Sequence, residues 1–262
     1  MKDYGLVSVV TPSYNCSAFI GETIESILSQ TYRNWELLIT DDCSTDNSRD
    51  IIEEYAAKDS RIKLLKLKEN SGAGVARNNS IQAAKGRFIA FCDSDDRWYP
   101  DKLEKQLAFM QKNDCYLSYT SYDVCSETGE IIGYVKCLNN LTKSKILRDN
   151  GIGCLTAIYN AEKIGKHYMP KMRKRQDWCL WIDIISKIGV ANGFQKSLAL
   201  YRDRANSISS NKIEMLKYNY EVYHTFLKKN PAVAWFMLIF KFIPYYFYKK
   251  LKQKSDFKKK GL

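Results

Sequence analysis

The chain of 262 residues has few of the residues that build a zinc site. It contains two histidines, and its eight cysteines form no Cys-x-x-Cys pair, whereas structural zinc sites need closely spaced Cys and His ligands. Several cysteines stand in apolar runs, as Cys92 does after Phe91, where a thiol acts as a small hydrophobic side chain. No signal peptide precedes the first apolar run at Leu6. These features predict a reduced, cytoplasmic protein without a zinc site.

The composition excludes two further classes of protein. Hydrophobic residues make up 45% of the chain, which is too many for a disordered protein, and charged residues make up 27%, which is too many for a multi-span membrane protein. The length suits one large α/β domain or two small ones.

Positive charge is concentrated near the C-terminus. The formal net charge is +12, and the segment from Lys212 to Leu262 holds 12 of the 41 basic residues but three of the 29 acidic ones. The first 211 residues are therefore almost neutral, and a partner that binds the basic charge meets the tail.

The first hundred residues alternate between short apolar runs and helical periodicity. Strands are expected at residues 6–10, 35–40, 62–67 and 87–92, and a helical pattern follows each of them, at 19–28, 46–56, 72–84 and 100–110. This alternation predicts an α/β fold with a mainly parallel, Rossmann-like sheet flanked by helices. The second half is less regular, with expected strands at 116–124 and 130–135 and an amphipathic helix at 177–188.

Two of the expected strands end in clusters of carboxylates, Asp41-Asp42 and Asp93-Ser94-Asp95-Asp96. Ligands of open α/β sheets bind beyond the carboxyl ends of the strands, so both clusters are expected at one edge. Asp93 and Asp95 would point to the same side and could hold a divalent cation together with phosphate oxygens; a solvated turn is an equal alternative. Asp42 could accept a hydrogen bond from a nucleobase, or it could belong to an Asx-turn and helix cap.

Two further segments are candidates for the site. Gly72-Ala73-Gly74 with Arg77 at a helix start suits the approach of an anion to the backbone, although a plain glycine turn is as consistent. Asp177 follows a basic cluster and precedes an apolar helical stretch. It is either a general base held by a rigid helix start or an ordinary acidic residue at the N-terminus of a buried helix.

Taken together, these motifs resemble the inverting nucleotide-sugar glycosyltransferases of family 2, which have the GT-A fold, over roughly residues 5–210. The motifs that carry the resemblance are Val7–Asn15, Ile27–Tyr32, Asp41–Asp46, Asn70–Asn78, Asp93–Asp96 with Trp98 and Pro100, and Gln176–Trp181. The sequence departs from the family at Cys43, where Gly is frequent, and at Gln176, where Glu is frequent.

The resemblance implies roles for individual residues. Pro12 and Tyr14 would line the base pocket, Asp42 would accept a hydrogen bond from uracil, and Arg77 would lie near the nucleotide. Asp93 would meet the ribose or the donor, with Ser94 beside it, and Asp95 would ligate Mg²⁺ or Mn²⁺ at the diphosphate. Asp177 would be the general base. Further candidates are Asp96, Trp178, Arg202 and Arg204; the last two fall where related enzymes carry a mobile loop that closes over the diphosphate, and a solvated loop is an equal alternative.

The tail combines an apolar stretch with a basic end. Residues 231–248 read PAVAWFMLIFKFIPYYFY, and seven lysines follow between Lys249 and Lys260. A spanning helix needs about 20 apolar residues, whereas aromatic and lysine residues of this kind are typical of the membrane interface. We therefore expect an amphipathic helical tail that binds an anionic membrane surface; the alternative is a helix packed on the domain with a solvated lysine end. Nucleic acid is not expected as a partner, because the tail has no Arg and no recognition motif accompanies it.

The sequence thus predicts a GT-A domain at residues 1–211 and a membrane-associating tail at 212–262. The expected activity is metal-dependent transfer of a hexose from a nucleotide-sugar donor, a UDP-hexose, to a saccharide or lipid-linked saccharide acceptor in cell-surface polysaccharide biosynthesis. The expected location is the cytoplasm, peripheral on the inner face of the cell membrane. A non-catalytic nucleotide-sugar-binding subunit and a nucleotidyltransferase of similar fold are the alternatives.

Overall fold

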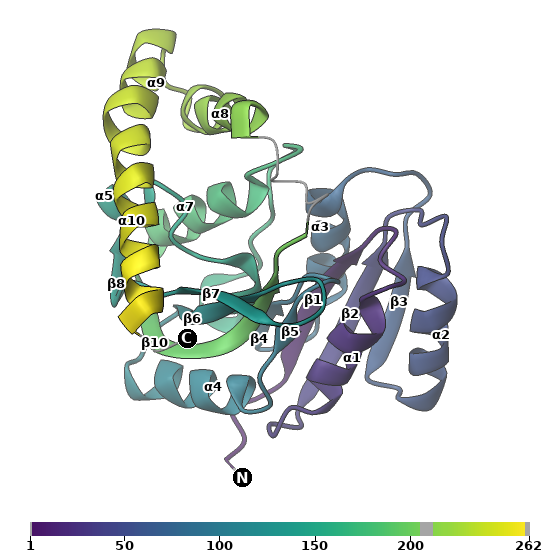
Figure 1. Cartoon of the computed structure of the whole chain (residues 1–262). Coiled ribbons are helices and arrows are strands. Elements are labelled where there is room, and N and C mark those ends of the chain that lie inside the picture. The colour runs from purple at the N-terminus through teal and green to yellow at the C-terminus, as the bar shows by residue number, and fades with distance from the viewer. Residues whose placement is uncertain (1, 205–211, 260–262) are drawn as a thin grey trace.

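The computed structural model describes residues 2–204 and 212–259, apart from the side chains of residues 212 and 213. Within these residues ten strands form one mixed sheet in the order β3-β2-β1-β4-β9-β6-β10-β5, with β7 beside β6 and β8 beside β10 (Figure 1). The strands are β1 (Val7–Ser13), β2 (Trp35–Asp41), β3 (Ile62–Lys66), β4 (Phe88–Phe91), β5 (Arg97–Trp98), β6 (Leu117–Cys125), β7 (Ile131–Val135), β8 (Asn140–Thr142), β9 (Ile158–Asn160) and β10 (Val190–Arg202).

Helices cover both faces of this sheet. The α-helices are α1 (Ile20–Leu28), α2 (Ser48–Lys58), α3 (Ala73–Ala83), α4 (Lys102–Lys112), α5 (Lys143–Ile146), α6 (Ala161–Ile164), α7 (Gln176–Ile188), α8 (Lys212–Glu221), α9 (Pro231–Met237) and α10 (Ile243–Lys259). A 3-10 turn, η1 (Cys154–Thr156), and two π-helical turns, η2 (Val222–Phe226) and η3 (Leu238–Phe242), complete the described elements.

The parallel half of the sheet confirms the predicted alternation. Strands β3, β2, β1 and β4 are parallel neighbours, and Ser13 is paired with Asp41 at the ends of β1 and β2. Parallel neighbours need crossover connections, which the helices provide. The short antiparallel strand β9 then lies between β4 and β6, and no expected strand corresponded to it.

Alternate residues of the central strands bury into two separate cores. Val7 and Val9 of β1 pack into the core under α1, α2 and α4, whereas Val10 packs into the core under α3 and α7. This follows from the two-residue period of a strand, which sends successive side chains to opposite faces. Both faces are apolar, as expected for parallel strands covered on both sides.

The C-terminal helices share the second of these cores. Trp178 of α7 packs against Tyr223 and Phe242, with ring centroids 5.7 Å and 5.9 Å away. Residues 231–259 form one continuous helical stretch, drawn in yellow in Figure 1. The predicted domain boundary at residue 211 lies outside the described residues.

Strand β10 is an element that the sequence pattern did not reveal. It starts with Val190-Ala191-Asn192-Gly193, in which Asn-Gly is typical of a turn rather than a strand. The structure explains the glycine, because a Cβ at residue 193 would lie 1.8 Å from the carbonyl oxygen of Leu138. Close approach of another backbone segment therefore requires Gly193 inside a strand.

A lysine is buried beneath the 3-10 turn η1. Lys102 of α4 has no exposed surface, and its Nζ donates hydrogen bonds to Oε1 of Gln106 at 2.5 Å and to the carbonyl oxygen of Thr156 at 3.3 Å. Its ammonium also lies 4.7 Å from the ring centroid of Trp98. Burial lowers the pKa of Lys102 from 10.5 to about 7.

This shift predicts a pH-dependent stability. Between about pH 7 and 10.5 the folded protein holds fewer protons at Lys102 than the unfolded chain does. The free energy of unfolding therefore rises with pH across this range, by at most about 1.4 kcal/mol per pH unit. Below pH 7 both states carry the proton and the cost of burying the charge is complete. Lys102→Met removes this dependence, which urea unfolding from pH 7 to 9.5 measures as a difference from the wild type. Lys112→Met, an exposed position on the same helix, should follow the wild-type slope; equal slopes for all three proteins would contradict the prediction.

Candidate active site

One large cavity, of about 1610 Å³, opens where β1, β2 and β4 end. Its walls also include the loop before η1, the start of α7 and one face of α10. The cavity brings together ten of the twelve predicted site residues: Pro12, Tyr14, Asp42, Arg77, Asp93, Ser94, Asp95, Asp96, Asp177 and Arg204. Trp178 and Arg202 are absent from its described lining.

Asp42 is held at the start of α3. Its Oδ1 accepts a hydrogen bond from the backbone N–H of Ser71, and its Oδ2 accepts one from that of Gly72, both at 2.7 Å. Gly72 has φ of +89°, a conformation that favours glycine. The carboxylate therefore closes the loop before α3, and each oxygen keeps a lone pair for a ligand in the cavity.

Arg77 forms an ion pair with Asp93 across the cavity floor. The Nη2 of Arg77 lies 2.5 Å from Oδ1 of Asp93. Arg77 is 7% exposed, and although burial opposes its charge, Asp93, Cys154 and Asp177 raise its pKa above the ordinary value. The guanidinium thus stays charged and fixes one of the two aspartates of the Asp-Ser-Asp motif.

The other aspartates of this cluster are crowded. Burial and then the charge of Asp93 raise the pKa of Asp95, while the ion pair with Arg204 at 3.0 Å lowers it. Burial and the neighbouring Asp95 raise the pKa of Asp96 well above its ordinary value. Asp96 is buried, and its Oδ1 accepts the backbone N–H of Arg202 at 2.9 Å, so its carboxylate joins the motif to β10.

The structure corrects the prediction for Arg202. This residue ends strand β10 and is 2% exposed, so it is part of the folded core and not of a closing loop. Its guanidinium donates hydrogen bonds to the carbonyl oxygens of Asp95 and Glu127 and to the carboxylate of Glu22. Arg202 therefore holds the backbone of the Asp-Ser-Asp motif from behind. Arg204 does line the cavity, and residues 205–207 of the predicted loop lie outside the described residues.

Trp178 also differs from the prediction. Its indole is fully buried, and its Nε1 donates a hydrogen bond to the carbonyl oxygen of Ile146 at 2.7 Å. Residue 178 follows Asp177 on α7, and helical geometry turns its side chain into the core while Asp177 faces the cavity. Trp178 thus positions α7 without reaching the site.

Asn150 is a site residue that the sequence did not reveal. Its Nδ2 donates a hydrogen bond to Oδ2 of Asp177 at 2.7 Å, and its Oδ1 accepts the N–H of Ile152 at 3.3 Å. Asn150-Gly151 reads as an ordinary turn in the sequence, and Asn150 directly precedes the stretch Gly151–Thr156. Five residues of that stretch, Gly151 to Leu155, line the cavity.

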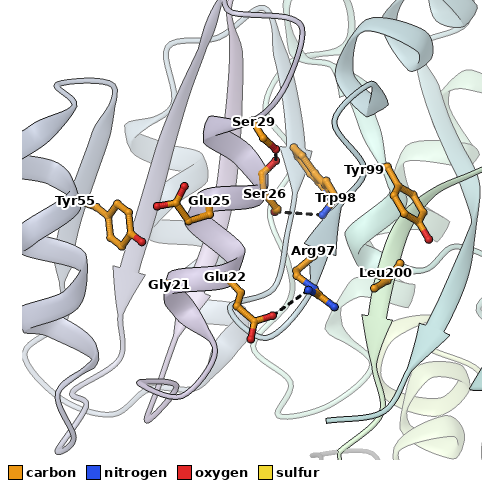
Figure 2. A pocket seen from close by; sticks show the side chains of 10 residues that line it. All are labelled: Gly21, Glu22, Glu25, Ser26, Ser29, Tyr55, Arg97, Trp98, Tyr99 and Leu200. Carbon is orange, nitrogen blue, oxygen red and sulfur yellow. Dashed lines mark hydrogen bonds and ion pairs between the residues drawn. The ribbon is translucent and has the colours of Figure 1, made fainter. Parts of the chain in front are cut away.

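A second, smaller cavity of about 630 Å³ lies beside α1 and β5 (Figure 2). In Figure 2 the side chains of Glu22 and Arg97 point toward each other, with 3.1 Å between Oε2 and Nη1. Glu22 also holds Arg202. This cavity contains none of the predicted site residues.

The Asp-Ser-Asp motif has oxygen atoms of the kind that a hard divalent cation prefers. Within residues 2–204 and 212–259, no three His, Cys, Asp or Glu side chains gather closely enough to hold a metal by themselves. Mg²⁺, however, is commonly held by one or two carboxylates together with substrate phosphates. Asp95, crowded by Asp93 and with its carboxyl partly exposed, offers this oxygen chemistry.

Comparisons with known proteins agree with this geometry. The model of the family "Glycosyl transferase family 2" matches residues 8–162. The chain belongs to glycosyltransferase family 2. It is 45% identical over 219 residues to the putative teichuronic acid biosynthesis glycosyltransferase TuaG of Bacillus subtilis, covering 83% of this chain and 87% of that protein.

A second relative is similar over most of its length. The chain is 41% identical over 241 residues to WfgD of Escherichia coli, a UDP-Glc:α-D-GlcNAc-diphosphoundecaprenol β-1,3-glucosyltransferase, covering 91% of this chain and 92% of that protein. Among solved structures, that of S. aureus TarS 1-349 with UDP-GlcNAc has a TM-score of 0.70 and 22% identity, covering 88% of this chain and 70% of that one. The predicted GT-A fold and glycosyltransferase family are therefore confirmed.

The contact between Asn150 and Asp177 predicts a measurable effect in this glycosyltransferase. Asn150→Asp keeps the hydrogen-bond acceptor Oδ1. It replaces the hydrogen-bond donor Nδ2, which lies 2.7 Å from Oδ2 of Asp177, with a carboxyl oxygen. Two carboxylates at this distance share a proton. With Asp177 as the predicted general base, the acid limb of the kcat–pH profile should therefore move up by about one pH unit or more. The affinity for the nucleotide-sugar donor should be unchanged.

Asn47→Asp is the matched control, because it places the same charge at the exposed N-cap of α2. An unchanged pH profile for Asn150→Asp, in an enzyme that folds and turns over normally, would show that the hydrogen bond has no part in catalysis.

Proposed function

We propose that this enzyme transfers a hexose from a UDP-sugar, with inversion, to a saccharide carried on a lipid diphosphate during assembly of a cell-surface polysaccharide. The observation that carries the proposal is the single cavity that joins Tyr14, Asp42 and the Asp-Ser-Asp motif to Asp177. The relatives support it, since TuaG is named for teichuronic acid biosynthesis and WfgD for a UDP-Glc donor and a diphosphoundecaprenol acceptor.

The nucleotide binds at the end of β1 and β2. The ring of Tyr14 lines the cavity and is 50% exposed, which leaves an apolar face for a base to stack on. Asp42 lies on the same wall, with lone pairs that can accept the N–H of uracil. Pro12 completes this wall, and the guanidinium of Arg77 lies below it.

The diphosphate binds over Asp93, Ser94 and Asp95. Mg²⁺ or Mn²⁺ held by Asp95 would supply positive charge where the leaving UDP gains negative charge. Arg204, which forms an ion pair with Asp95, provides a second cation that can turn toward the phosphates. Asp93, fixed by Arg77, contacts the donor beside them.

Asp177 takes the proton from the acceptor hydroxyl. A sugar hydroxyl has a pKa far above 7, so its attack on the anomeric carbon requires a base in the transition state. The oxygen–carbon bond to the acceptor forms as the bond from the anomeric carbon to UDP breaks, and the proton passes to Asp177. Asn150 keeps the carboxylate oriented through its hydrogen bond. One displacement of this kind inverts the anomeric centre.

The C-terminal helix associates with the membrane. Among the described residues, 231–259 form one helix that is long and apolar enough to cross a membrane by length and composition. Its docked face packs into the core, yet Trp235, Phe236, Phe240, Phe247 and Leu251 are exposed. An amphipathic helix of this kind, with lysines following, suits a peripheral position on the anionic cytoplasmic leaflet.

Release of UDP from a panel of UDP-sugars tests the proposal. With a lipid-linked acceptor and Mn²⁺ or Mg²⁺, one donor should give turnover, and Asp177→Asn should reduce kcat by about a thousandfold or more while UDP binding persists, because the base is lost and the donor end is intact. Chelation of the metal should also reduce turnover. Asp50→Asn, an exposed carboxylate on α2, is the matched control.

The alternatives give different results. Metal-dependent UDP binding without turnover on any acceptor would favour a non-catalytic binding subunit. Transfer of UMP to an acceptor with release of the sugar 1-phosphate would indicate a nucleotidyltransferase. Failure to bind UDP would overturn the proposal.

A further inference from the structure

The two ends of the large cavity carry opposite charge. At the donor end the carboxylates of Asp42, Asp93, Asp95 and Asp96 outnumber the guanidinium groups of Arg77 and Arg204. The far end, beyond Asp177, is lined by basic side chains that exceed its carboxylates, among them Arg148, Arg173, Arg175, Lys249, Lys250 and Lys252. An excess of cations facing a shared cavity favours an anionic ligand there.

One of these cations forms an ion pair with a buried carboxylate, that of Asp149. The Nζ of Lys249 lies 2.5 Å from Oδ2 of Asp149. Arg148 directly precedes Asp149 in the chain, and it lines the same cavity as Tyr245 and Lys249. Arg148 follows α5, whereas Lys249 belongs to α10. The ion pair with Asp149 therefore neutralises one cation of the group.

Arg175 brings a third cation to the same place. Arg175 also lines the cavity, and its guanidinium carbon lies 5.9 Å from the ring centroid of Trp178, which packs against Tyr223. Its backbone has φ of +63°, uncommon for a residue other than glycine, and its Nε is buried without a hydrogen-bond partner in the described structure. Strain and an unpaired buried donor in a residue that lines a cavity are typical of a ligand site.

The cations lie next to the catalytic base. Asn150 donates to Asp177 through its side chain, and its carbonyl oxygen accepts a hydrogen bond from Nζ of Lys249 at 3.0 Å. The single residue Asn150 thus links the carboxylate of Asp177 to the ammonium group of Lys249. An acceptor sugar with its hydroxyl at Asp177 can therefore reach these cations with a group on its anomeric carbon.

The helix that supplies Lys249 also has an exposed apolar face. Tyr245, Tyr246 and Lys249 line the cavity, whereas Phe247 and Leu251 are among its most exposed hydrophobic residues. A lipid chain lying along the apolar face has its polar head close to the basic end. The same helix can therefore serve both parts of one lipid-linked ligand.

We propose that Arg148, Arg175 and Lys249 form a binding site for the diphosphate of the acceptor, separate from the donor diphosphate at Asp95. This proposal rests on the proposed function, in which the acceptor is lipid-linked. Selectivity for the acceptor then comes from its lipid diphosphate as well as from its sugar.

Binding of farnesyl diphosphate in neutral detergent micelles tests the site, with UDP and Mg²⁺ at saturation so that the donor end is occupied. Arg148→Gln, at an exposed position, should weaken binding about tenfold or more, because a charged hydrogen bond to phosphate is lost. Lys254→Gln, an exposed lysine of α10 outside the described cavity lining, should bind as the wild type does. Farnesol should bind all three proteins equally and weakly.

Other outcomes would overturn the site. Equal affinity of the three proteins for farnesyl diphosphate would show that Arg148 does not contact the diphosphate. If inorganic diphosphate bound as tightly as the farnesyl ester, the site would serve a free anion rather than a lipid. The Arg148→Gln variant could instead lose affinity for phosphatidylglycerol vesicles and keep its affinity for farnesyl diphosphate. That result would show that the cations bind lipid headgroups of the membrane.

The Lys249→Gln variant tests whether these cations bind the diphosphate or only support the loop that holds Asn150. It should weaken farnesyl diphosphate binding and, by releasing Asn150, also reduce kcat, whereas Arg148→Gln should raise the KM for the lipid-linked acceptor and leave kcat unchanged. An equal loss of kcat in both variants would indicate that the cations only support the loop. The binding assay requires no sugar transfer, so its failure remains distinguishable from a failure of the UDP-release experiment.

Discussion

Repulsion among carboxylates at one edge of the sheet is the constraint on which the site depends. Parallel strands that end together bring Asp42 and the Asp-Ser-Asp motif to one edge. Each carboxylate has its own compensation: backbone N–H groups for Asp42, Arg77 for Asp93 and Arg204 for Asp95. These contacts leave Asp95 crowded and only partly neutralised, which suits it to a cation arriving with a substrate.

The opposite polarity of the two cavity ends gives the reaction a direction. A donor diphosphate accompanied by a cation fits the acidic end, and an acceptor diphosphate without one fits the basic end. Asp177 lies between them and is oriented by Asn150. In the proposed reaction the acceptor hydroxyl would reach Asp177 from the side opposite the leaving group, which is the geometry that an inverting displacement requires.

The C-terminal helix has two kinds of contact that a simple anchor would lack. Phe242 packs on Trp178 in the core, and Lys249 holds Asp149 and the carbonyl oxygen of Asn150. The helix thereby supports α7 and the loop that orients Asp177. Because its outer face is apolar, the proposed membrane association and the proposed acceptor site would depend on the same helix.

The parallel half of the sheet and the position of most of the candidate site follow from local features of the sequence. Strand periodicity and helix signals are local, and in parallel strands the residue after each strand necessarily reaches the same edge, so Asp42 and Asp93 could be placed together without a structure. Tertiary structure alone decided the places of Arg202, Trp178 and Asn150. Arg202 reaches Asp95 from 107 positions away, and Lys249 reaches Asn150 from 99 positions away. No local pattern encodes such contacts, because they depend on how distant segments pack.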